Sequence, residues 1–173
     1  INYDTKEQFT FNDLITKAKF IGRALVAMGV ERGEVVMLCM DNSPQAVYLF
    51  LAVSLAGAVA CTLSPKLYAD EMHFQLVESD CRIAFADPMA IPELQKVFRS
   101  LNKPHRILCA GSRDLSDGYP ILEDLQFLGD SSVSDDVMLP RIQPRHDIVY
   151  LPFSSGIHGK RKGILTTHNS WVT

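Results

Sequence analysis

The chain lacks several features that mark specialised classes of protein. Its 173 residues carry 17 Lys and Arg against 20 Asp and Glu, and the formal net charge is −3. A nucleic-acid-binding domain usually shows a strongly basic face, so no nucleic-acid partner is predicted. Aromatic residues make up only 9% of the chain, with a single tryptophan. The hydrophobic content of 47% and the charged content of 21% are those of an ordinary globular domain.

Cysteine and histidine are present, but not in metal-binding or redox spacings. No two of the four cysteines form a C-x-x-C pair, and the five histidines show no ligand spacing, so no metal site is predicted. Two disulfides would be feasible in a secreted protein. No signal peptide precedes the cysteines, however, and we expect free core thiols in an intracellular protein, cytoplasmic or peroxisomal. The first residue is not methionine, so the sequence leaves open whether a leader peptide has been removed.

Charge is absent from residues 42–65, a span long enough for a membrane helix. Proline, glycine and several hydroxyl residues interrupt it. We therefore interpret it as a buried helix over residues 44–56, capped by Ser43, followed by a buried strand over residues 58–62. No transmembrane segment is predicted.

The remaining pattern alternates between helical and strand periods. Apolar residues recur at i, i+3 and i+4 over residues 11–28, and Thr10 with Asp13 forms a capping-box pattern at the start. Further elements follow in order: a strand at 35–40, a helix at 70–79, a strand at 82–86, a helix at 87–101 and a strand at 106–110. Such alternation predicts an α/β fold with a mostly parallel sheet flanked by helices. Residues 129–136 are predicted to form an exposed loop.

Residues 154–163 carry the clearest chemistry in the chain, with two serines, three glycines and three cations in a run of ten. Glycines let backbone N–H groups converge on an anion, hydroxyls donate further hydrogen bonds, and lysines neutralise charge. An apolar strand over residues 148–153 precedes this run, and a second strand is predicted at 164–167. The spacing does not fit the Walker motif. A strand–loop–strand that binds phosphate is predicted, and a hairpin with a solvated basic tip remains the alternative.

With these features the chain resembles the adenylate-forming (AMP-binding) superfamily, which includes acyl-CoA synthetases, coumarate–CoA ligases and beetle luciferases. The phosphate-loop signature of that family reads approximately S-S-G-T-T-G-x-P-K-G, followed after a strand by T-H-x-N. The matching residues here are Ser154, Ser155, Gly156, Gly159, Lys162, Gly163, Thr167, His168 and Asn169. Weaker matches, Glu71 among them, extend over essentially the whole chain. Family members run to several hundred residues, so residues 1–173 are interpreted as an N-terminal fragment of an AMP-binding domain that lacks the C-terminal part of the same protein.

The resemblance implies an ATP-dependent acid–thiol ligase. A fatty or aryl carboxylic acid would attack the α-phosphate of ATP, and coenzyme A would then take the acyl group from the resulting acyl-adenylate. Mg²⁺ is expected in the intact enzyme, with its carboxylate ligand in a later segment, and no catalytic residue is assigned in this fragment. The residues expected to bind the nucleotide are Ser154, Ser155, Gly156, Ile157, His158, Gly159 and Lys162. Asn169 is expected to cap the helix that follows, and Trp171 receives no role.

The loop departs from the family signature at three positions. Ile157 and His158 stand where the family has two threonines, and Arg161 stands where it has proline. Isoleucine has no side-chain donor, and a lost hydrogen bond to a charged group costs about 1.5–3 kcal/mol. Weaker nucleotide binding is therefore expected. A non-catalytic homologue that acts as a scaffold or interaction module is the alternative, but we favour the ligase because the glycines and the lysine of the loop persist.

Overall fold

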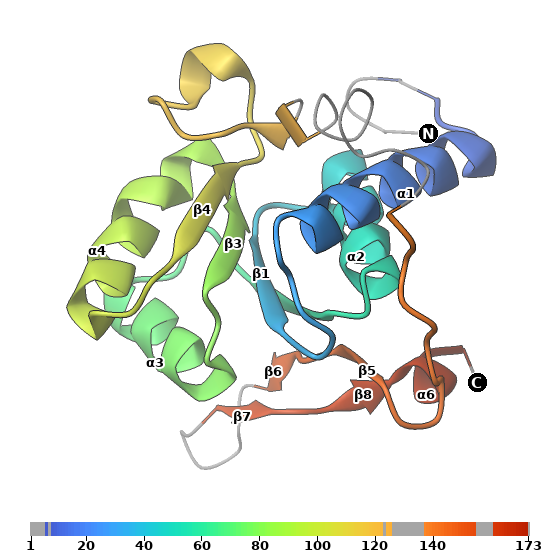
Figure 1. Cartoon of the computed structure of the whole chain (residues 1–173). Coiled ribbons are helices and arrows are strands. Elements are labelled where there is room, and N and C mark those ends of the chain that lie inside the picture. The colour runs from blue at the N-terminus through green and yellow to red at the C-terminus, as the bar shows by residue number, and fades with distance from the viewer. Residues whose placement is uncertain (1–5, 7, 123, 126–136, 155–160, 173) are drawn as a thin grey trace.

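A six-stranded sheet forms the centre of the molecule, with helices on both faces (Figure 1). The computed structural model describes residues 6, 8–122, 124–125, 137–154 and 161–172. The strand order in this sheet is β4-β3-β1-β2-β5-β8. Its strands are β1 (Val35–Cys39), β2 (Val59–Leu63), β3 (Ile83–Ala86), β4 (Arg106–Cys109), β5 (Ile148–Tyr150) and β8 (Thr166–Thr167). All neighbours pair in parallel except β5 and β8, which confirms the predicted mostly parallel sheet.

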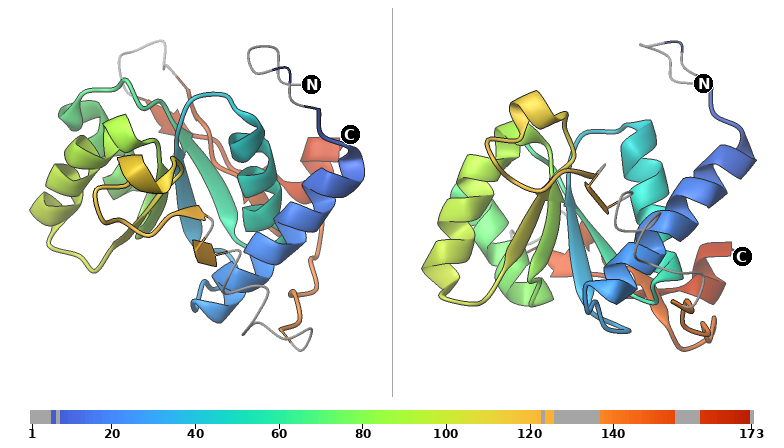
Figure 2. Two further views of the ribbon diagram at one scale, coloured as in Figure 1. Left: turned by 90° about the horizontal axis from the view of Figure 1, so that it is seen from above. Right: turned by 45° about the horizontal axis from the view of Figure 1, so that its top comes forward.

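Four helices cover the two faces in pairs. They are α1 (Phe11–Ala27), α2 (Pro44–Leu55), α3 (Ala69–Ser79) and α4 (Ile91–Leu101). One apolar cluster lies between the sheet and α1 and α2, and a second lies between the sheet and α3 and α4. Figure 2 shows the two pairs on opposite sides of the strands. Helices on both faces bury most of the central strands, so β1 and β2 are apolar except at Thr62, which is exposed near the end of β2.

Strand β1 shows how the sequence produces this arrangement. Alternate side chains of a strand point to opposite faces. Leu38 accordingly packs in the cluster under α1 and α2, while Met37 and Cys39 pack in the cluster under α3 and α4. All three are almost completely buried. Each is apolar because neither face of the strand reaches water.

The helix starts follow the predicted caps. The Thr10 side chain accepts a hydrogen bond from the Asp13 N–H, and the Asp13 side chain accepts one from the Thr10 N–H, which completes the capping box. Ser43 Oγ accepts a hydrogen bond from the Ala46 N–H at 3.1 Å. Gly57 follows α2 with a φ of +73°, a conformation that favours glycine, and turns the chain into β2.

Helix α2 occupies the charge-free stretch and is only 12 residues long. Its residues Leu49, Ala52 and Val53 are fully buried in the cluster shared with α1. Within the described part of the chain, no helix is long and apolar enough to cross a membrane. The interpretation of residues 44–56 as a buried helix is therefore confirmed.

Three predicted elements differ from the structure. The predicted strand at 148–153 is divided into β5 (Ile148–Tyr150) and β6 (Phe153–Ser154), which belong to different sheets. The predicted helix over residues 87–101 is a 3-10 turn, η1 (Pro88–Ala90), followed by α4 from Ile91. Pro92 has no N–H to donate and fits only in the first turn of an α-helix, so the regular helix begins immediately before it. The predicted strand at 164–167 is shorter, because only Thr166 and Thr167 belong to β8. The predicted loop at 129–136 lies outside the described residues.

Candidate functional site

The predicted strand–loop–strand begins and ends in a small separate sheet. Strand β6 (Phe153–Ser154) pairs in an antiparallel register with β7 (Lys162–Gly163), so that Ser154 lies opposite Lys162. A serine hydroxyl and a lysine ammonium group thus come from the base of the predicted phosphate loop. The other predicted nucleotide-binding residues, Ser155, Gly156, Ile157, His158 and Gly159, lie outside the described residues.

Helix α3 holds both strands of this ribbon. On β6, the Phe153 ring meets the Phe74 ring edge-on, with 6.2 Å between centroids. Beside β7, Arg161 Nη2 donates a hydrogen bond to Glu71 Oε1 at 2.5 Å. Glu71 and Phe74 are three residues apart, a spacing that places them on the same side of a helix. The ribbon is therefore attached to one side of α3 at two points, one apolar and one charged.

Gly163 allows β7 to pass close to the end of β5. A Cβ atom at this position would lie 2.9 Å from Leu151 Cδ1 and 3.5 Å from Phe153 Cζ. Leu151 is buried and packs with the cluster under α3 and α4. The glycine thus permits the contact between the ribbon and the apolar core.

A network around Asp147 fixes the entry into β5 and the start of α6 (His168–Val172). Arg32 Nη2 donates to Asp147 Oδ1 at 2.5 Å, and the Gln143 N–H donates to Asp147 Oδ2 at 2.6 Å. The Arg32 guanidinium and this backbone N–H hold the pKa of the Asp147 carboxyl below its usual value. The His168 N–H donates to the Asp147 carbonyl oxygen at 3.1 Å, which ties the two segments together.

The predicted cap of α6 was wrong. Thr167 Oγ1, not the Asn169 side chain, accepts a hydrogen bond from the Ser170 N–H at 3.2 Å. The helix already includes His168, so Asn169 lies within its first turn, where its own N–H donates to the Pro144 carbonyl oxygen at 2.8 Å. Threonine is a good N-cap, and Thr167 stands immediately before the helix, three residues ahead of the N–H that it accepts.

The four cysteine thiols show no sign of a catalytic or redox role. Cys39, Cys61, Cys81 and Cys109 are all buried and free, which confirms the expected unpaired state. Burial raises the pKa of Cys39, Cys61 and Cys81 to about 12. Thiols of this kind are protonated at neutral pH and are poor nucleophiles. Among the residues that the structure describes, no group of three His, Cys, Asp or Glu side chains could share a metal ion.

Several long-range contacts were not anticipated from the sequence, and two of them involve residues already named in its analysis. One is the Arg161–Glu71 ion pair, whose partners are 90 residues apart. The other is an aromatic cluster in which the Trp171 ring lies 5.3 Å from that of Phe50 and 5.1 Å from that of Tyr150. No short-range pattern connects these positions, because only the order of the strands brings them together.

Comparison with known proteins gives a consistent result. The family model for AMP-binding enzymes matches residues 1–173. The chain is 31% identical to 4-coumarate-CoA ligase 1 of Narcissus pseudonarcissus over 98% of its own length and 29% of that relative. It is 30% identical to a 4-coumarate–CoA ligase of Humulus lupulus over 100% of its own length and 30% of the relative. The chain thus spans less than a third of these proteins.

Comparison with solved structures agrees with the family match. The crystal structure of an anthranilate CoA ligase in complex with anthranoyl-AMP matches 94% of this chain and 29% of its own, with a TM-score of 0.78 and 26% identity. A luciferase-like enzyme from the nonluminescent mealworm Zophobas morio matches 98% of this chain and 38% of its own, with a TM-score of 0.85. Its identity is 21%, so that likeness supports the fold alone.

Proposed function

The chain belongs to the AMP-binding enzyme family, and we propose on that basis that it is the N-terminal part of the adenylate-forming domain of an ATP-dependent acid–thiol ligase. The intact protein would activate a fatty or aryl carboxylic acid as an acyl-adenylate and transfer the acyl group to coenzyme A. Residues 154–163 would form its phosphate loop. The similarity to two 4-coumarate–CoA ligases supports a CoA ligase over other members of the family.

The ribbon of β6 and β7 is the observation that carries this proposal. It follows β5 of the main sheet, and its two strands flank in sequence the glycine-rich residues of the family signature. Ser154 and Lys162 face each other at its base. A hydroxyl donor and an ammonium group are well suited to phosphate oxygens, and glycine-rich backbone can turn several N–H groups toward one anion.

The residue roles follow from the chemistry of adenylation. The attacking carboxylate is already an anion, so little acid–base catalysis is needed, and the protein contributes mainly positioning and charge neutralisation. We assign the β- and γ-phosphates to the hydroxyls of Ser154 and Ser155, the backbone amides of residues 156–159 and the ammonium group of Lys162. Mg²⁺ would neutralise further phosphate charge. The described residues offer no cluster of metal ligands, and we assign it none in this chain.

The alternative is a non-catalytic homologue that serves as a scaffold or interaction module. Ile157 and His158 favour it, since they replace the two threonines of the family signature. The persistence of Lys162 and Gly163, both placed in β7, favours the ligase.

The deciding experiment is ATP–pyrophosphate exchange by the complete protein with a panel of fatty and aryl acids. We expect exchange with at least one acid, a rise of ~5-fold or more in apparent ATP affinity for His158→Thr, and a loss of at least tenfold for Lys162→Ala. If neither the natural protein nor His158→Thr shows exchange or ATP binding, the ligase proposal fails and the non-catalytic homologue is favoured. The 173 residues alone are not expected to form acyl-adenylate, and detection of that product with the purified chain would contradict this.

A further inference from the structure

The connections that follow β1 and β2 leave the sheet on opposite faces. Strand β1 continues into α2 on one face, which leads to β2. Strand β2 continues into α3 on the other face, which leads back past β1 to β3. In open α/β sheets, ligands bind in the crevice at the carboxyl ends of two adjacent strands whose connections diverge in this way. The carboxyl ends of β1 and β2 are such a place.

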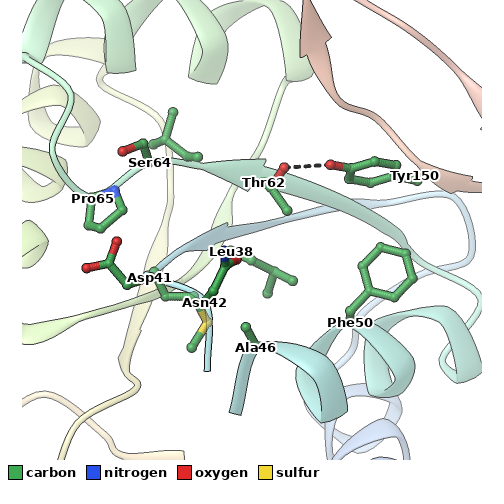
Figure 3. A pocket seen from close by; sticks show the side chains of 11 residues that line it. Leu38, Asp41, Asn42, Ala46, Phe50, Thr62, Ser64, Pro65 and Tyr150 are labelled. Atoms are coloured by element: carbon green, nitrogen blue, oxygen red, sulfur yellow. Dashed lines mark hydrogen bonds between the residues drawn. The ribbon is translucent and has the colours of Figure 1, made fainter. Parts of the chain in front are cut away.

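A cavity of about 400 Å³ lies at this position, between the strand ends and the first half of α2 (Figure 3). Its volume is within the range of small-molecule sites, which extends from roughly 300 to 1,000 Å³. Residues from β1, β2, α2 and β5 line it, together with residues 40–42 and 64–65 of the connections that follow β1 and β2. It does not include any residue of the β6–β7 ribbon.

One side of the cavity is apolar and aromatic. Leu38, Ala46 and Phe50 line it, and the Phe50 ring meets the Tyr150 ring edge-on with 5.5 Å between centroids. Trp171 contacts both rings, so they are held in place by a third aromatic side chain. A fixed aromatic wall provides packing area for a planar ring at little entropic cost.

The other side offers two hydroxyl groups. Thr62 Oγ1 and Tyr150 Oη lie 2.8 Å apart in a hydrogen bond, which Figure 3 shows at the end of β2. This bond uses one of their two donors and one of their acceptor sites. One donor and several lone pairs remain for a hydroxyl group of a ligand.

One carboxylate and no cationic side chain line the cavity. The carboxylate is that of Asp41, and Lys66 Nζ, which lies 3.3 Å from Asp41 Oδ2, is not among the lining residues. A carboxylate or phosphate ligand would find no cation in the lining and would lie near a negative charge. The lining therefore favours an uncharged ligand.

We propose that this cavity is a binding site for an uncharged aromatic compound that bears a hydroxyl group. The ring packs against Phe50, and the hydroxyl group bonds to the pair formed by Thr62 and Tyr150. The site is separate from the ribbon of β6 and β7, and it does not depend on the proposed ligase activity.

The test uses Trp171, the only tryptophan in the chain, as a fluorescent reporter beside the wall of the cavity. The 173-residue chain is titrated with 4-hydroxybenzyl alcohol, which is uncharged, and with 4-hydroxybenzoate, which has the same ring and an anionic group. We expect a saturable change with the alcohol and at least tenfold weaker binding of the benzoate. No saturable change with the alcohol, or equal affinity for the two compounds, would overturn the proposal.

Three variants test whether the compound binds in this cavity. Ala46→Leu places a larger side chain in the cavity and should abolish binding. Thr62→Val removes one hydroxyl and should weaken binding ~5- to 10-fold. Val47→Leu changes the adjacent residue, which is 49% exposed and does not line the cavity, and should leave binding unchanged. Circular dichroism confirms that each variant is folded. Unaltered binding in folded Ala46→Leu, or in Thr62→Val, would contradict the assignment.

Discussion

Arg161 and Glu71 join the end of the proposed phosphate loop to helix α3, with 2.5 Å between Arg161 Nη2 and Glu71 Oε1. Both side chains are about one third exposed, so the pair contributes little to stability, within about 1 kcal/mol. Its importance lies in position, since Arg161 directly precedes Lys162. The pair holds the strand that presents this lysine.

We therefore predict that Arg161→Ala weakens ATP binding by the complete protein several-fold while the urea midpoint of unfolding changes little. The reason is that, of the two described attachments of the ribbon to α3, only the contact of Phe153 on β6 with Phe74 then remains. Isothermal calorimetry with ATP measures the affinity. Lys96→Ala is the control, because it removes the cation of another ion pair, that of Lys96 with Glu93 on α4. An equal loss of affinity in both variants would refute a role for the position of Arg161.

A second prediction concerns Gly163→Ala. The new methyl group would meet Leu151 Cδ1 at 2.9 Å, and overpacking of this kind costs about 1–3 kcal/mol. The free energy of unfolding from urea denaturation should fall by that amount. The double variant Gly163→Ala with Leu151→Ala removes the obstructing atom, and its cost should be less than the sum of the two single changes. Simple additivity would mean that this contact is not the cause.

A third prediction concerns acid stability. The pKa of the Asp147 carboxyl is held below its usual value of 3.8, mainly by the hydrogen bond from Arg32. A carboxyl group with a lowered folded pKa contributes stability that is present above the unfolded pKa and is lost as the pH falls through the folded one. In Arg32→Ala the pKa of Asp147 should rise, so this loss should occur at higher pH. Carbon-13 NMR titration of the Asp147 carboxyl tests it, and an unchanged midpoint in the variant would refute it.

A fourth prediction concerns the thiols. Burial raises the pKa of Cys39, Cys61 and Cys81 to about 12, and Cys109 is equally inaccessible. Native chain at pH 8 should react with Ellman's reagent only as fast as it opens, whereas all four thiols should react at once in urea. A thiol that reacts within seconds in the native chain would show that one of these sites is accessible.

Periodicity alone located most of the regular elements, because their apolar faces repeat at the spacing of a helix or a strand. The capping box of Thr10 and Asp13 and the cap at Ser43 are local features, and both were predicted correctly. The cap of α6 was predicted incorrectly. Thr167 and Asn169 are both suitable caps, and the choice depends on where Asp147 and Pro144 bind the adjacent backbone.

Local sequence patterns predicted only part of the candidate site. The pattern of glycines and cations identified residues 154–163, and the structure pairs Ser154 with Lys162 at their ends. The attachment to α3 and the cavity beside Thr62 depend on contacts between segments about 90 residues apart. Contacts of this kind are set by strand order, which a single sequence does not display.

All four cysteines lie in the cluster under α3 and α4, whereas Trp171 contacts Phe50 and Tyr150, which pack against the cluster under α1 and α2. The chain therefore has a natural probe in each of its two hydrophobic layers. Thiol labelling reports when the first layer opens, and tryptophan emission reports when the second one does. Coincident denaturation curves from the two signals would mean that the layers melt as a single cooperative unit, and separate curves would resolve an intermediate in which one layer survives.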